Sequence, residues 1–179
     1  MNLGGLARPI DSLDSERMFF VKSDIDRFEQ YRSTLDDAIK GQTLAPAYDM
    51  FSVYLQRVGE RTAFARALLK KDFDFSKDEN YRFDREDHPW EPTRLALDDA
   101  WRRRVKNDVL RLKLAGKDMA EIRKTLDKRY ANFESRVRDL KSDDVFQSLM
   151  NAYAGSIEPH TGYMTPRTSE NFNISMRLS

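Results

Sequence analysis

The chain carries only two histidines, and one of them lies in a segment rich in groups that could take part in chemistry. In SIEPHTGYMTPRTSENF, which runs from Ser156 to Phe172, His160 has a glutamate, a threonine and a tyrosine close by in sequence. Such side chains could form an active site, because histidines and carboxylates serve as general acids and bases near neutral pH. The two prolines of the segment restrict the backbone, so a rigid connector explains the same residues equally well.

Neither histidine belongs to a known catalytic or metal-binding pattern. His88 lies in DHPW, where a local cap or turn is the better interpretation, and no two histidines have the helical spacing of a zinc site. The absence of cysteine excludes thiolate metal sites and cysteine catalysis. LAGKD lacks the spacing of a phosphate-binding loop, and Gly155–Ser156 lacks the frame of a nucleophile elbow. We therefore expect no catalytic residue, metal or cofactor in this chain.

The stretch DFDFSKDEN places oxygen-bearing side chains at alternate positions, as in a calcium-binding loop: Asp72, Asp74, Ser76 and Asp78. Such a loop also needs a glycine at its sixth position and a bidentate acid at its twelfth. Lys77 and Phe83 occupy those positions here. The sequence therefore favours a solvated loop.

The basic run WRRRVK, from Trp101 to Lys106, raises the question of phosphate binding. On a helix these residues spread around the circumference, and the nearby acids Asp98, Asp99 and Asp108 offer ion-pair partners. The 31 basic and 30 acidic residues of the chain give a net charge of +1. This balance argues against a dedicated nucleic-acid binder and favours a solvated helix face.

Apolar residues make up 40% of the chain and recur at three- and four-residue steps, which predicts an all-α array of about five helices. The first is expected to begin at the N-cap Ser23 and end at Gly41, and the second to run from near Pro46 to about Lys70. Gly59 interrupts the apolar pattern of the second helix, although a single glycine inside a helix costs only about 1 kcal/mol. No apolar run approaches the about 20 residues that span a membrane.

The third and fourth helices are expected to form an antiparallel hairpin. Thr93 is the expected cap of the third, which ends at Gly116, and Asp118 with Glu121 begins the fourth in the manner of a capping box. A fifth helix is expected from Ser142 to Gly155.

Between the second and third helices, residues from about 71 to 92 lose the helical period and form an irregular insert. Its aromatic residues should dock it on the helices as a long ordered loop or a small hairpin: Phe73, Phe75, Tyr81 and Phe83.

Several motifs resemble the tail-specific (carboxy-terminal processing) proteases, in particular their large periplasmic branch. EPHTGYMTPRTSENFN, from Glu158 to Asn173, resembles the acidic-Pro-His-Ser/Thr-x-Tyr-x-x-Pro signature that precedes the PDZ domain in that family. The upstream segments SLDSERMFFVKSDIDRFEQYRSTLDDAI, RVKNDVLRLKLAGKDMAEIRKTLDKRY and SDDVFQSLMNAYAGSIEPHT also match that branch in order. The resemblance covers nearly the whole chain. The residues that match the connector motif are Glu158, Pro159, His160, Thr161, Tyr163 and Pro166.

The resemblance implies an N-terminal helical domain at residues 1–155 and a connector at residues 156–179 that leads to a PDZ domain. Family members continue into a protease core with a catalytic serine and lysine, and no matching nucleophile segment is present here, so no catalytic residue is carried over. It also implies a periplasmic location, with the signal peptide outside this sequence. The implied partners are the PDZ and protease domains of the same protein, unfolded protein substrates and a helical-repeat lipoprotein adaptor, with no nucleic acid and no membrane span.

The sequence leaves three alternative functions for this chain. The first is a non-enzymatic domain of such a protease, which serves substrate access, adaptor docking and placement of the PDZ domain. The second is a stand-alone helical interaction module. The third, a hydrolase or metal enzyme in its own right, is disfavoured because the candidate groups do not converge.

Overall fold

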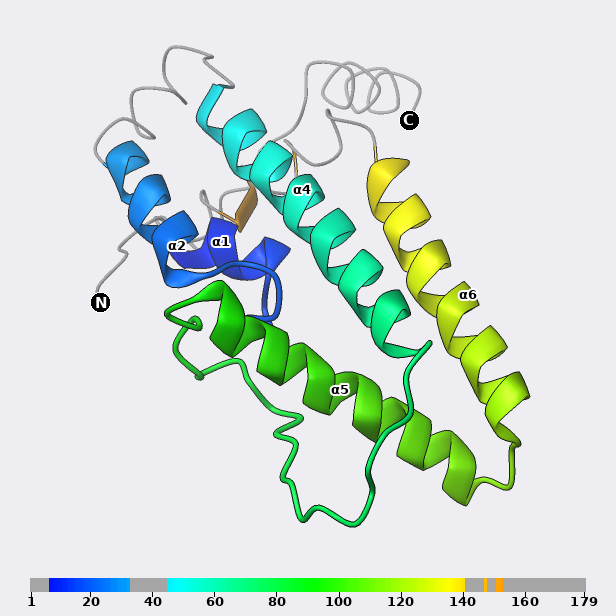
Figure 1. Cartoon of the computed structure of the whole chain (residues 1–179). Coiled ribbons are helices and arrows are strands. Elements are labelled where there is room, and N and C mark those ends of the chain that lie inside the picture. The colour runs from blue at the N-terminus through cyan, green and yellow to red at the C-terminus, as the bar shows by residue number, and fades with distance from the viewer. Residues whose placement is uncertain (1–6, 33–44, 141–146, 148–150, 153–179) are drawn as a thin grey trace, which may run out of the picture. The chain divides into compact units, whose positions relative to one another are not determined.

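The computed structural model describes residues 7–32, 45–140, 147 and 151–152, and the regular structure of this part is helical (Figure 1). In chain order the elements are α1 (Ala7–Leu13), α2 (Lys22–Phe28), the short 3-10 helix η2 (Glu29–Tyr31), α4 (Ala45–Leu68), α5 (Arg94–Leu114) and α6 (Met119–Arg138). The prediction of an all-α fold is confirmed. None of the described helices is both long and apolar enough to cross a bilayer.

The chain divides into two compact units. The first contains residues 1–13, 29–51 and 140–179, and the second contains residues 14–28 and 52–139. In the described part of the first unit, Ile10 and Met50 are buried, and the hydroxyl of Tyr31 donates to Asp49 Oδ2 at 2.9 Å. The second unit holds α2, α5, α6 and most of α4, and the rest of this description concerns it.

The predicted caps of α5 and α6 are confirmed. Thr93 has an extended backbone, and its Oγ1 accepts from the backbone N–H of Ala96 at 3.2 Å. Asp118 Oδ1 accepts from the N–H of Glu121 at 2.9 Å. Both side chains satisfy an N–H group that has no partner inside its helix. The boundaries of these helices are therefore encoded locally.

The prediction that Ser23 caps a helix is wrong. The helix α2 begins at Lys22, so Ser23 lies inside its first turn. The capping carboxylate belongs to Asp24, whose Oδ2 accepts from the N–H of Val21 at 3.1 Å while its own N–H donates to Val21 O at 2.9 Å. Val21 is held extended by an isolated parallel bridge to Glu91, which the sequence did not indicate.

Two other predicted helix features lie outside the described residues. Gly41, the expected end of the first helix, is one of them, but the prediction of one continuous α-helix is already wrong before it, because α2 ends at Phe28 and η2 follows as a 3-10 helix. Of the expected fifth helix only residues 147 and 151–152 are described, as helical. The helix α1 was not predicted, since seven residues are too short to establish a period, although Pro9 near its start suits a first turn.

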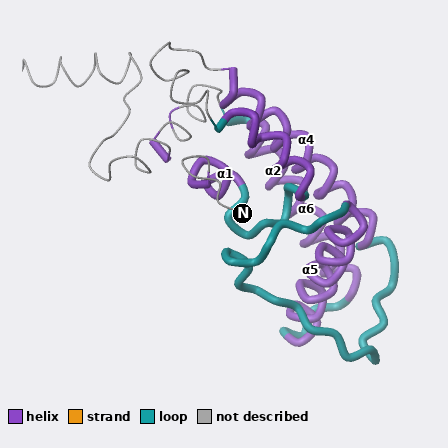
Figure 2. Tube along the Cα trace, turned by 90° about the vertical axis from the view of Figure 1, so that its left-hand side faces the viewer, coloured by secondary structure: helices purple, strands orange, loops and turns teal. Residues whose placement is uncertain are grey.

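The three long helices are joined by polar contacts as well as by apolar packing. α4 and α6 run antiparallel, because Thr62 Oγ1 donates to Glu134 Oε2 at 2.8 Å and Arg66 Nε pairs with Asp127 Oδ1 at 2.7 Å (Figure 1). α5 and α6 form the predicted hairpin, and the hydroxyl of Tyr130 donates to Asp108 across it at 2.7 Å. Figure 2 shows the irregular segments passing beside these helices.

Phe19 lies where the three helices meet. Its ring contacts Tyr54 of α4, Trp101 of α5 and Phe133 of α6, with ring centroids 5.5, 5.7 and 5.7 Å away. The surrounding core is apolar, and most of its members come from the predicted helical stripes: Val58, Ala65, Leu97, Trp101, Val105, Val109, Ile122, Leu126 and Tyr130. An irregular segment therefore supplies the central side chain of the core.

The predicted insert is a long ordered loop, and the described residues 71–90 contain no strand, so the small hairpin is not formed. Phe73, Phe75 and Tyr81 are partly buried, as expected of docking residues. Phe83 is 61% exposed, so its predicted docking is wrong. It packs edge-on against Tyr81 instead, at a centroid distance of 4.8 Å.

Two glycines have different structural roles. Gly59 lies inside α4, where an added Cβ would come within 2.8 Å of Arg138 Nη2, the end of a flexible side chain. Gly116 lies in the α5–α6 turn, just after the end of α5, with φ +83°, and no atom lies within 4 Å of an added Cβ there. A larger residue is therefore opposed at Gly59 by the nearby side chain, and at Gly116 by the backbone conformation.

We expect alanine at these two positions to have opposite effects on stability. Gly59→Ala should stabilise the chain by up to about 1 kcal/mol, because alanine favours a helix and Arg138 can move aside. Gly116→Ala should destabilise it by about 1–2 kcal/mol, because a Cβ disfavours positive φ. Urea unfolding of both variants would measure the difference. Destabilisation of Gly59→Ala by as much as Gly116→Ala would show that Arg138 cannot move.

Candidate functional site

The residues of the connector motif lie outside the described part of the chain, so the structure does not test their role: Glu158, Pro159, His160, Thr161, Tyr163 and Pro166. The other histidine is described. The backbone N–H of His88 donates to Arg85 O at 2.9 Å, and its Nδ1 lies 2.8 Å from Pro89 O. His88 thus lies in a turn, as DHPW suggested.

Two acidic residues of the insert bond to other protein groups. Asp74 Oδ1 accepts from both the N–H and the hydroxyl of Ser76, and Asp72 pairs with Arg123 at 2.7 Å. Across residues 7–32 and 45–140, no group of three histidine or acidic side chains is arranged to hold a metal ion. The interpretation of DFDFSKDEN as a solvated loop fits these contacts.

The basic run on α5 is occupied by ion pairs. Glu79 of the loop pairs with Arg102 and Lys106, each at 2.5 Å, and Asp99 pairs with Arg102 and Arg103, each at 2.8 Å. A solvated, paired helix face was predicted. The expected partners Asp98 and Asp108 instead pair with Arg61 and Arg129, and the main partner, Glu79, comes from the loop.

Glu79 therefore fastens the loop to α5. Hydrogen bonds from Arg102 and Lys106 lower the pKa of Glu79 to about 2. Phe75 adds to the attachment, since the ammonium groups of Lys106 and Lys113 lie 5.8 and 5.1 Å from its ring centroid. A hollow of about 110 Å³ beside Tyr81 and Leu110 has room for a few waters only, far below the size of a usual ligand pocket.

The end of the loop is fixed to the segment that carries Phe19. The guanidinium of Arg17 lies 4.2 Å from the ring centroid of Trp90, and its Nη1 donates to His88 O at 2.6 Å. The N–H of Lys22 donates to Glu91 O at 2.9 Å, and Glu91 also pairs with Arg85 at 2.8 Å. Both ends of the loop are thus held by charged groups.

The segment itself is organised by Asp14. Asp14 Oδ1 accepts from the N–H of Met18 at 2.8 Å, and Oδ2 accepts from those of Phe19 and Phe20 at 3.1 and 2.9 Å. Burial raises the pKa of Asp14, and the three N–H donors oppose that rise. Met18 O then accepts from the indole of Trp101. This arrangement fixes the backbone that places Phe19 in the core.

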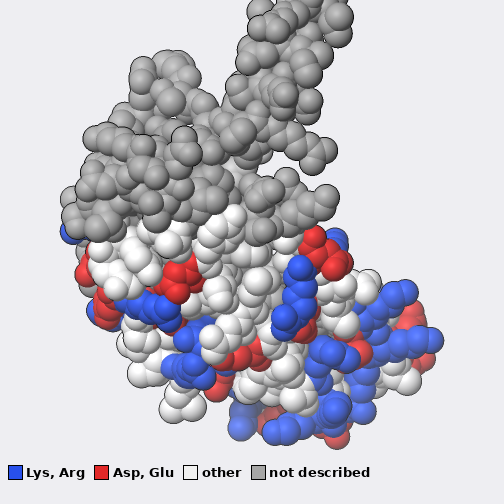
Figure 3. All heavy atoms as spheres, turned by 90° about the horizontal axis from the view of Figure 1, so that it is seen from above, with Lys and Arg blue, Asp and Glu red and all other residues white. Residues whose placement is uncertain are grey.

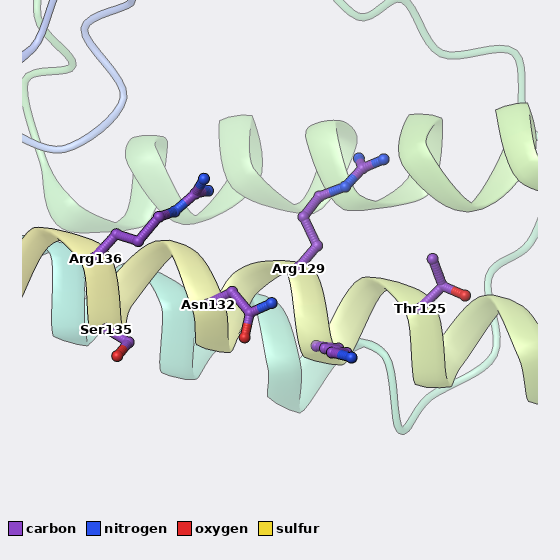
Figure 4. A pocket seen from close by; sticks show the side chains of 6 residues that line it. Thr125, Arg129, Asn132, Ser135 and Arg136 are labelled. Carbon is purple, nitrogen blue, oxygen red and sulfur yellow. The ribbon is translucent and has the colours of Figure 1, made fainter.

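A second surface feature follows one side of α6. A hollow of about 570 Å³ is bounded by six exposed polar side chains at helical spacing: Thr125, Lys128, Arg129, Asn132, Ser135 and Arg136 (Figure 4). Three of them are cationic and none is acidic. The sequence analysis followed the apolar stripe of this helix and missed this face, although the same period would have indicated it.

We expect the attachment of the loop to weaken in acid. The pKa of Glu79 is about 2 in the folded chain and 4.5 ordinarily, so its ion pairs stabilise the fold above pH 4.5 and are lost as the pH falls towards 2. Glu79→Gln should therefore lower the unfolding midpoint at pH 7 and flatten its decline below pH 4.5. Thermal unfolding across this range, with Asp78→Asn as the neighbouring control, measures the effect. Parallel declines for wild type and Glu79→Gln would contradict it.

Comparison with known proteins places these features in a family. Residues 6–167 match the family model described as the tail specific protease N-terminal domain. The tail-specific protease of Haemophilus influenzae is 38% identical over 173 residues, which cover 96% of this chain and 25% of that protein. The chain thus spans about a quarter of the length of the curated relative it matches. The family match covers most of the chain, and the chain belongs to the tail-specific protease N-terminal domain family.

Proposed function

We propose that this chain acts as the non-catalytic N-terminal helical domain of a periplasmic tail-specific serine protease. The observation that carries the proposal is the family match, which spans residues 6–167 and corresponds to one quarter of a tail-specific protease. The contacts of the described residues support a structural role, because Asp72, Glu79 and Asp99 pair with basic side chains and the bases of the α5 run are paired in turn.

The proposed domain has three tasks, which are to shape substrate access, to dock a helical-repeat lipoprotein adaptor and to position the PDZ domain. A platform for such tasks must be rigid, and the fixed loop and the aromatic contacts of Phe19 support that property. Residues 1–155 form the helical part of the proposal, and residues 156–179 form the connector. In the connector, Pro159 and Pro166 would limit how the PDZ domain can be oriented.

A mixing experiment tests the proposal. We expect this chain, added to a separately produced PDZ-plus-protease portion of the same protein, to bind it and to change its cleavage of an unfolded reporter with an apolar C-terminus. Both effects are expected if the two separately produced pieces associate and the helices complete the path by which substrate reaches the protease. Calorimetry measures the binding, and gel analysis of the reporter measures the cleavage.

The control in this experiment is the PDZ-plus-protease portion alone, with the folding of both pieces verified by circular dichroism. If the folded pieces neither bind nor alter cleavage, the stand-alone helical interaction module becomes the better account. Cleavage of the reporter by the chain alone would contradict its non-catalytic role.

A further inference from the structure

We propose that the outward face of α6 is a docking surface for an acidic polypeptide segment. This basic face comprises six residues: Thr125, Lys128, Arg129, Asn132, Ser135 and Arg136. The inference rests on the charges of this face and on membership of a protease family, and it does not depend on the substrate, adaptor or PDZ roles proposed above.

The residues of the basic face form one continuous strip. Steps of three and four residues along α6 link all six, with Lys128–Arg129 and Ser135–Arg136 as adjacent pairs, so they share one side of the helix. The strip covers eleven residue steps, or about 17 Å at 1.5 Å per residue. Figure 4 shows these side chains along the helix. The hollow that they line has a volume of about 570 Å³.

Within this stretch of α6, the acidic side chains face α4 and the basic side chains of the strip face outward. Two acidic residues lie within the same stretch, and both are directed to α4, where Asp127 pairs with Arg66 at 2.7 Å and Glu134 accepts from Thr62 at 2.8 Å. The outward strip retains only bases. Glu121 and Asp139 lie beyond its two ends, and Glu121 is already paired with Lys117.

The cations of the basic face lack strong partners within the described structure. Lys128 and Arg136 make no ion pair or hydrogen bond with another described side chain, and Arg129 lies 3.8 Å from Asp108, which already accepts from Tyr130 at 2.7 Å. Elsewhere in this unit Arg57, Arg102 and other cations are closely paired, and Figure 3 shows acidic and basic groups interspersed over much of the visible surface.

The chemistry of the face favours a peptide with several carboxylates. An extended segment of five or six residues spans about 17 Å, so its carboxylates can reach the cations at both ends of the strip. Thr125, Asn132 and Ser135 add side-chain donors and acceptors suited to peptide groups. Among the described residues that line the hollow, none is apolar or aromatic, so they supply no anchor of the kind with which a helix binds a membrane surface.

Polypeptide is favoured over nucleic acid on two grounds. The chain as a whole has a net charge of only +1, so it has little long-range attraction for a polyanion. It also belongs to a family of proteases, whose ligands are polypeptides. We therefore assign the surface to an acidic stretch of protein.

Peptide binding tests the assignment on the 179-residue chain. We expect a fluorescein-labelled hexaglutamate peptide to bind at 20 mM salt, to bind several-fold more weakly at 200 mM because salt screens surface charges, and to be bound more tightly than hexaglutamine. The double variant Lys128→Glu/Arg136→Glu should weaken binding at least tenfold, and Lys128→Gln/Arg136→Gln should weaken it less. Fluorescence anisotropy gives the dissociation constants.

The matched control is Lys71→Glu/Arg111→Glu, which alters two exposed cations off this face by the same total charge. It should bind nearly as well as wild type, and all variants should keep the wild-type unfolding midpoint. The assignment is overturned if hexaglutamate does not bind, or if the control loses as much affinity as the α6 variant. It is also overturned if hexathymidylate or phosphatidylserine vesicles bind this face more tightly than hexaglutamate.

Discussion

The packing of the second unit depends on one buried constraint, which is the capture of three backbone N–H groups by the carboxylate of Asp14. Because Met18, Phe19 and Phe20 donate to this one side chain, their backbone needs no strand or helix partner to be satisfied while buried. Phe19 can then reach one aromatic ring from each long helix. An irregular segment thereby becomes the centre of a helical core.

Charge pairing extends the same organisation to the surface. The carboxylate of Glu79 fixes the long loop to α5, and Asp24 joins α2 to α4 through Arg57 at 2.7 Å. A backbone hydrogen bond from Lys22 to Glu91 fixes the loop at a second place. The Asp24–Arg57 pair is largely buried and the Glu79 pairs are partly buried, so loss of one partner would leave a charge poorly solvated. These pairs set the position of the irregular backbone. The outward strip of α6 is the contrasting case, where bases remain available to a partner.

The predictable features were those encoded within a few residues. Thr93 and Asp118 each cap a helix by accepting from the backbone N–H three residues later, and Gly116 adopts a positive φ that favours glycine. Each feature depends only on neighbouring residues, so the sequence indicated it. The loop attachments escaped prediction because Glu79 and Arg102 are 23 residues apart, and nothing local distinguishes the partly buried Phe75 from the exposed Phe83. The Asp14 contacts also escaped, since they occur in a segment with no regular period. The connector motif lies outside the described residues, so its role stays a prediction.

Amide hydrogen exchange at Met18, Phe19 and Phe20, followed by NMR in wild type and in Asp14→Asn, tests the central claim most directly. Wild-type amides should exchange about as slowly as those in the middle of α5, because they open only with the core. Asp14→Asn replaces one carboxylate oxygen by an NH2 donor. It should therefore speed exchange at least tenfold at those of the three amides that lose their acceptor, since a buried donor left without an acceptor costs about 1–3 kcal/mol. Exchange in wild type as fast as that of the exposed loop residues Asp78 and Asn80 would contradict the account.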